Sequence, residues 1–153
     1  DLAYPDGKPF DSEAFFVEPQ SGEITLLTKD VAGGPSYALR VPPVVTPMGP
    51  LTPVVQCPGA PRALSFPGGK FPAITSASIS PAGDAILVRA YSGAFLWSRL
   101  PGESVATALG RQPCALPVTA EAQGEAIGVG PDGTSYYTIS EGAGAEINGF
   151  QRD

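Results

Sequence analysis

The sequence predicts an all-β protein made of three consecutive small antiparallel sheets, and three observations support this. A strand–turn–strand pattern occurs three times, with turn glycines at Gly22, Gly83 and Gly133. Apolar and polar residues alternate with a period of two between the turns. The 18 prolines and 19 glycines lie mostly between short apolar runs, as in proteins with many turns. Repeats of 40 to 50 residues with four short strands are typical of β-propeller blades.

The first blade is expected over residues 11–70. Its hairpin has strands within 11–19 and 23–29, joined by the turn Gln20-Ser21-Gly22. Later strands are expected at 37–41 and, as the outer strand, at 63–66. Seven prolines between Pro42 and Pro61 predict a loop, with a short edge pairing at Val54–Val55. Residues 1–7 are expected to hold the outer strand of a preceding blade and a turn.

The second blade is expected over 71–119 and the third over 120–153. In the second, strands within 74–80 and 85–91 flank the turn Pro81-Ala82-Gly83, and a third strand follows at 94–98. Its fourth strand is either 105–109 or 114–117. In the third, Pro131-Asp132-Gly133 joins strands at 126–129 and 136–139, and 146–151 forms a third strand.

Three blades do not close a ring, because propellers have about four to eight. We therefore expect the chain to be the C-terminal half of a six-bladed propeller. The remaining blades would come from the rest of a longer chain, a cleaved fragment or a second copy. The alternative is three unrelated hairpins in a two-layer sandwich.

Composition excludes several function classes. The formal charge of −6 and the absence of a Lys/Arg cluster disfavour binding to nucleic acid. No apolar run approaches the roughly 18 residues of a membrane span. Histidine is absent, which excludes Ser-His-Asp catalysis, Cys-His catalysis and His-ligated metal sites within this chain.

The sequence has two cysteines, Cys57 and Cys114. An even pair in a chain rich in Pro and Gly predicts one disulfide and a secreted, extracellular or cell-surface location. The bridge would join the outer regions of the first two blades. Two buried free thiols are the alternative.

Several short segments resemble exported bacterial six-bladed propeller proteins of the WD40-like or phytase-like group. They are Tyr4-Pro5-Asp6-Gly7, Asp11-Ser12-Glu13-Ala14, Leu27-Thr28-Lys29, Arg89-Ala90-Tyr91, Gln123-Gly124-Glu125-Ala126 and Ser140-Glu141-Gly142. The resemblance implies a propeller fold and export. Phytase-like propellers use calcium bound by carboxylates, so calcium is the candidate cofactor. No complete calcium-ligand motif occurs here.

Superposing the repeats on their turns gathers polar residues at one edge of the sheets, which in a propeller is one mouth of the central channel. The candidates are Asp11, Glu13, Lys29, Thr75, Arg89, Tyr91, Glu125 and Glu141. One interpretation is a polar pocket in which Glu13, Glu125 and Glu141 bind a metal ion. The other is a set of ion pairs that lock neighbouring blades.

Two functions follow from these interpretations. The leading hypothesis is an exported, non-catalytic propeller that acts as a binding or structural module. The alternative is a calcium-assisted phosphoesterase with carboxylates at the channel mouth. A calcium-dependent rise in melting temperature would favour the second.

Overall fold

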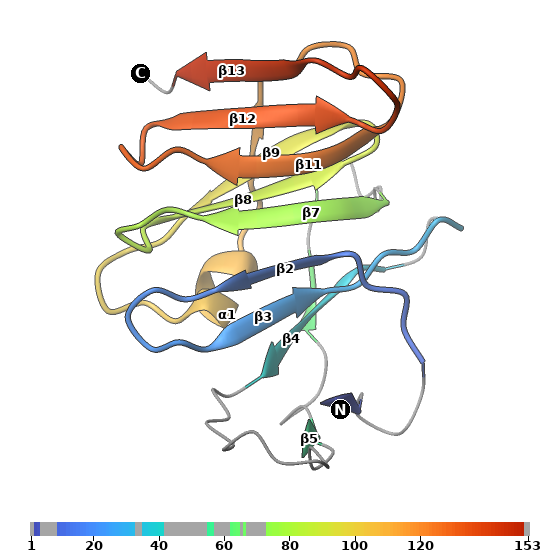
Figure 1. Ribbon diagram of the computed structural model, residues 1–153. Helices are drawn as coiled ribbons and strands as arrows, with labels where there is room; N and C mark the ends of the chain where they lie inside the picture. Colours follow the sequence, from blue (N-terminus) through green and yellow to red (C-terminus); the bar gives the residue numbers. More distant parts are fainter. Residues whose placement is uncertain are drawn as a thin grey trace, which may run out of the picture.

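The structure is a computed structural model that describes residues 2–3, 9–32, 35–41, 55–56, 62–64, 66 and 73–151. It is mostly β, with three antiparallel sheets that follow one another in chain order (Figure 1). The all-β prediction is therefore confirmed. The predicted hairpins belong to three separate sheets. No helix within the described ranges has the length and apolarity needed to cross a membrane.

The first sheet has the order β2-β3-β4-β6, and its strands span Ala14–Val17, Ile24–Leu27, Tyr37–Val41 and Arg62–Ala63. Its outer strand β6 was expected at 63–66 and pairs with β4 through Tyr37 and Ala63. Most of the proline-rich segment 42–61 lies outside the described residues. Within it, β5 (Val55–Gln56) pairs in parallel with β1 (Leu2–Ala3).

The second sheet has the order β10-β9-β8-β7, with strands at Cys114–Leu116, Gly93–Ser98, Ala85–Ala90 and Ile74–Ile79. The third has the order β11-β12-β13, with strands at Gly124–Val129, Ser135–Ser140 and Ile147–Gln151. The first strands β2, β7 and β11 lie side by side and point the same way (Figure 1).

Of the two candidates for the second outer strand, Cys114–Leu116 is the strand and Val105–Leu109 is a helix, α1. The short apolar run at 105–109 was one of two candidates for a strand, but Ser104 before it starts a helix instead. Its hydroxyl accepts a bond from the Thr107 N–H, which caps the helix N-terminus. The buried side chains of Val105, Ala108 and Leu109 then pack α1 into the core.

The three hairpins repeat the same backbone bonds. At the turn, Glu18 N–H donates to Glu23, Ser80 N–H to Ala85 and Gly130 N–H to Ser135, each at 2.8 Å. At the opposite edge, Lys29 N–H donates to Asp11, Tyr91 N–H to Ala73 and Glu141 N–H to Gln123. The turn glycines Gly22, Gly83 and Gly133 have φ of 71°, 75° and 72°, a conformation that favours glycine. The hairpins are therefore structural repeats.

We call the side of each sheet that faces the next sheet along the chain its front face, and the other its back face. The front face of the first sheet and the back face of the second share one core cluster, which includes Phe16, Leu27, Ile86, Val88 and Trp97. A second cluster joins the second and third sheets. It contains Leu87 and Ala94 from the former and Ile127 and Tyr136 from the latter.

The predicted disulfide between Cys57 and Cys114 is corrected by the structure. Cys114 is a free, exposed thiol at the start of β10, the outer strand of the second sheet. At this position the strand turns the cysteine side chain to solvent and not toward a neighbouring sheet. Cys57 itself lies outside the described residues.

Candidate functional site

Five of the predicted site residues form one row of polar contacts along an edge that all three sheets share. We call this row the polar edge; it consists of Glu13, Lys29, Tyr91, Gln123, Glu125 and Glu141. Lys29, Tyr91 and Glu141 occupy equivalent positions in the repeats, since each lies one or two residues after the end of the second strand of its hairpin. Each donates its backbone N–H to the segment before the first strand. The hairpin register therefore brings these side chains together.

Lys29 joins the first sheet to the second. Its ammonium donates to Glu13 Oε2 at 2.6 Å and to the Tyr91 hydroxyl at 2.7 Å. It also lies 4.5 Å from the centre of the Tyr91 ring, within the range of a cation–π contact. The Lys29 side chain is 5% exposed, whereas that of Glu13 is 41% exposed. Burial alone would lower the pKa of Lys29, but the bonds to Glu13 and Tyr91 outweigh it and raise the pKa above its usual value.

Gln123 continues the row into the third sheet, and sequence reasoning missed it. Its side-chain amide donates to Glu125 Oε1 at 2.5 Å and to Glu141 Oε2 at 2.6 Å. An amide NH₂ has two protons, so these two bonds use both of them. The 3.5 Å contact with the Tyr91 hydroxyl is therefore a close approach and not a third full bond.

A second polar cluster lies beneath the polar edge, between the second and third sheets. Arg89 is 1% exposed and donates from Nη2 to Glu121 Oε2 at 2.8 Å. Glu121, which sequence reasoning also missed, accepts bonds at Oε1 from Thr138 at 2.6 Å and from Asn148 at 3.1 Å. Burial alone would raise the pKa of Glu121, but the bonds from Thr138, Arg89 and Asn148 hold it below its usual value. The two opposite charges are therefore kept inside the protein as a pair.

Gly124 makes room for the Arg89 guanidinium. A Cβ at Gly124 would lie 1.9 Å from Nη2, 2.1 Å from Cζ and 2.4 Å from Nε of Arg89. The Gly124 backbone carbonyl accepts a bond from the Thr75 hydroxyl at 2.7 Å. The guanidinium therefore fits only because residue 124 has no side chain.

The remaining predicted residues have structural partners. Thr75 is buried and binds Gly124 as described, at the point where the pairing of β7 with β8 shifts register. Arg89 belongs to the buried cluster and not to the polar edge, and its Nη1 donates to the Ala90 carbonyl at 2.8 Å. Asp11 is exposed, and its backbone carbonyl accepts from the Lys29 N–H.

The carboxylates of the polar edge do not form a metal cluster. Within the described parts of the chain, no group of three or more His, Cys, Asp or Glu side chains is placed to hold a metal ion. Glu125 and Glu141 approach each other through the shared Gln123 amide, whereas Glu13 is paired with Lys29 on the first sheet. The three predicted metal ligands are thus divided between two places.

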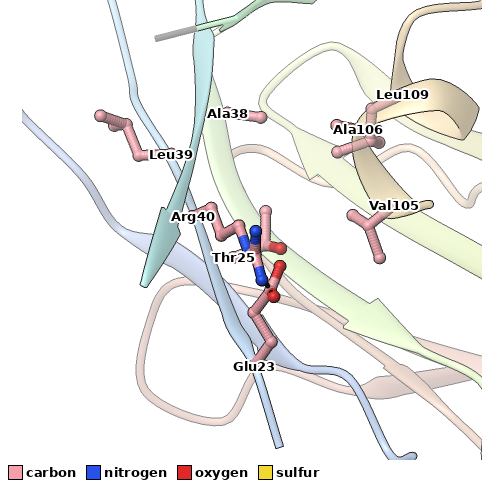
Figure 2. A pocket seen from close by; sticks show the side chains of 8 residues that line it. All are labelled: Glu23, Thr25, Ala38, Leu39, Arg40, Val105, Ala106 and Leu109. Carbon is pink, nitrogen blue, oxygen red and sulfur yellow. Dashed lines mark ion pairs between the residues drawn. The ribbon is translucent and has the colours of Figure 1, made fainter. Parts of the chain in front are cut away.

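The opposite edge, where the turns lie, has a small slot between the first sheet and α1 (Figure 2). Its volume is about 50 Å³, and Ala38, Val105 and Leu109 line its apolar part. An ion pair between Arg40 and Glu23 lies at its side. Small-molecule sites usually measure about 300 to 1,000 Å³, so the slot is too small for such a ligand.

An open hollow of about 360 Å³ adjoins the slot. Its charges are paired within the protein: Glu18 bonds Arg99 at 2.9 Å, and Glu23 bonds Arg40. Burial alone would raise the pKa of Glu18, but its bonds to Ser21 and Arg99 hold the pKa below its usual value. This bond links the first turn to the segment after β9, so it ties the first sheet to the second at the turn edge.

Comparisons with known proteins gave no match, either against models of protein families or among curated proteins.

Proposed function

We propose that the chain forms three consecutive blades of a β-propeller and serves as a non-catalytic structural or binding module of an exported protein. The observation that carries this proposal is the polar edge, in which Lys29 of the first sheet binds the Tyr91 hydroxyl of the second. Support for the blade arrangement comes from the repeated backbone bonds and from the side-by-side first strands β2, β7 and β11. In a propeller the first strands line the channel, so the polar edge would surround one of its mouths.

The pairing at the polar edge favours a structural role. Lys29 is buried and satisfied by one partner on its own sheet and one on the next, Glu13 and Tyr91. Such a bond fixes the position of one sheet relative to its neighbour. A site built for a ligand would instead leave polar groups directed at an open cavity. Further blades are the partners that this proposal requires, and the net charge of −6 disfavours binding to nucleic acid.

A double-mutant cycle with Lys29→Met and Tyr91→Phe tests the structural role. The two residues belong to different sheets and touch through one hydrogen bond and a cation–π contact, of which Tyr91→Phe removes the hydrogen bond. We expect a coupling free energy of unfolding of about 0.5 kcal/mol or more, as found for groups in direct contact. Additive losses, or a gain in stability on removing Lys29, would count against the structural role, because functional sites are often built at a cost in stability.

A calcium-assisted phosphoesterase is the competing function, and one observation favours it: Glu125 and Glu141 meet at the Gln123 amide. The same protein should be heated with and without calcium and assayed with a phosphate monoester. If our proposal is right, calcium does not change the melting temperature, and the protein does not hydrolyse the phosphate monoester. A rise of several degrees that is lost in Glu125→Gln, together with calcium-dependent hydrolysis, would establish the competing function.

A further inference from the structure

Among the described residues, the first two sheets each have an outer fourth strand, and the third sheet has three strands. In the first sheet β6 pairs antiparallel with β4, and in the second β10 pairs antiparallel with β9. Both outer strands lie opposite the same position of the repeat, Ala38 in β4 and Ala94 in β9. The equivalent position in the third sheet, by strand register, is Ile147 of β13. In the part of the chain that the structure describes, no strand pairs with the edge of β13 that points away from β12 (Figure 1).

The outer strands of the first two sheets also bring apolar side chains into the cores between sheets. Leu64 and Phe66, which follow β6, are 2% and 3% exposed and belong to the core cluster between the first and second sheets. Leu116 of β10 and Val118 just after it pack against the cluster between the second and third sheets. In both sheets, two apolar residues at alternate positions therefore reach the core on the front face.

The corresponding front face of the third sheet exposes its apolar side chains. Ile147 is 71% exposed, whereas Ala94 at the equivalent position is 1% exposed. Ile147 pairs with Ile139, two residues beyond Tyr137 on β12, so Ile147 and Tyr137 lie on the same face. Tyr137 is 46% exposed. The third sheet thus presents to solvent the kind of surface that an outer strand shields in the other two.

The sequence of β13 also differs from those of the outer strands. A proline stands directly before each of them, Pro61 before β6 and Pro113 before β10. Proline beside an outer strand hinders the addition of a further strand, because it has no N–H to donate. β13 (Ile147–Gln151) has no proline within it or next to it. Its edge is therefore open to pairing with another strand.

We propose that β13 binds an extended segment of another polypeptide. This segment pairs antiparallel opposite residues 147–149 and places apolar side chains at alternate positions over the front face of the third sheet. Backbone bonds to the edge hold the segment, and its apolar side chains give the specificity. The inference rests on the register of the repeats, so it holds whether or not the sheets are blades of a closed ring.

A second copy of β13 fits the edge less well than such a segment. On the front face, β13 carries Gly149 and Gln151 beside Ile147. It would therefore supply one apolar side chain where each observed outer strand supplies two.

The second sheet's own outer strand provides the probe, as a synthetic peptide of residues 112–119 with Cys114→Ser. Titration of the ¹⁵N-labelled chain with millimolar peptide should shift the amide signals of β13. Peptides N-methylated at Ala115 or at Leu116 form the matched pair. Successive N–H groups of a strand point to opposite sides, so one methyl group removes a bond to β13 and the other faces away. We expect one of these peptides to bind about fivefold more weakly and the other to bind like the parent.

A charge on the front face should also weaken binding. Ile147→Asp should reduce the affinity for the peptide about tenfold, because the carboxylate would be buried under the apolar side chains of the peptide. Val31→Asp is the control, since Val31 is 74% exposed and lies between β3 and β4 of the first sheet. Circular dichroism verifies that both variants stay folded.

Unchanged β13 signals would overturn the inference. Equal binding of the two N-methylated peptides would do so as well, because the peptide would then cover a face without extending the sheet. Slow hydrogen exchange of every β13 amide in the free chain would show that the edge is already occupied, by this chain in a monomer or by a second copy in a dimer. None of these results changes the coupling between Lys29 and Tyr91, which tests the structural role separately.

Discussion

The Gly124→Ala substitution probes the buried ion pair more sharply than any change to the charges themselves. The added Cβ would overlap three atoms of the Arg89 guanidinium, the closest at 1.9 Å. The guanidinium is 1% exposed and is held by Glu121 and the Ala90 carbonyl, so it has to leave its place. Separating a buried ion pair costs about 3 to 5 kcal/mol. Alanine also restricts the unfolded chain more than glycine does, and this offsets about 0.4 to 1 kcal/mol of that cost.

The expected net loss is therefore about 2 to 4 kcal/mol, which lowers the melting temperature by roughly 4 to 16 °C in a domain of this size. Urea denaturation followed by Trp97 fluorescence would measure it. Gly93→Ala is the matched control. It lies in a strand, its φ is not positive, and its Cβ would meet one atom at 4.0 Å. We expect this control to be neutral or slightly stabilising.

Making Gly124→Ala in a variant that lacks the ion pair distinguishes the steric mechanism from a general intolerance of alanine at this position. In Arg89→Leu/Glu121→Gln the guanidinium is gone, and Gly124→Ala should then cost little. If Gly124→Ala is no worse than Gly93→Ala, or equally costly in both backgrounds, the account of the Arg89 site is refuted.

Three further predictions concern other parts of the chain. Because the pKa of Glu121 is lowered in the folded state, its contribution to stability is complete above pH about 4.5 and is lost as pH falls through the folded pKa. In urea titrations at decreasing pH, the free energy of unfolding should therefore fall less in Glu121→Gln than in the wild type. The same pH profile in both proteins would contradict this. Trp97→Phe removes the bond from the indole N–H to the Arg111 carbonyl at 2.8 Å and should lower the free energy of unfolding by about 1 to 3 kcal/mol; an unchanged denaturation midpoint would refute that. Cys114 should react with iodoacetamide in the folded, unreduced protein, and peptide mass spectrometry showing it protected would restore the disulfide.

The hairpins were predictable because two local signals coincide in each of them. Alternation of period two gives the strands, and the turn between them contains a glycine with positive φ. Because the repeats are equivalent, the sequence also predicts that Lys29, Tyr91 and Glu141 lie at one edge of the sheets. The polar edge was thus accessible from the sequence wherever its members lie at the ends of strands.

Residues outside the strands were not accessible in this way. Glu121 and Gln123 precede β11 in an irregular segment, where no periodicity shows which way a side chain points. The helix α1 was missed as one of two possible strands, because five residues are too few to distinguish helical from alternating spacing. Its formation depends on one hydroxyl, that of Ser104.

Ser76 and Ser78 of β7 have a consequence for the behaviour of the protein that their place in the sequence does not show. In an alternating strand such serines suggest a face turned to water. Here their hydroxyls accept bonds from the Ile127 and Val129 N–H groups of β11, at 3.3 and 3.1 Å. β11 is the outermost strand of its own sheet, and an outermost strand with free N–H groups is a template on which other chains can add by β-pairing. Two serines of the neighbouring sheet accept bonds from those groups, so this side of β11 is protected from pairing with other chains without a proline in the strand.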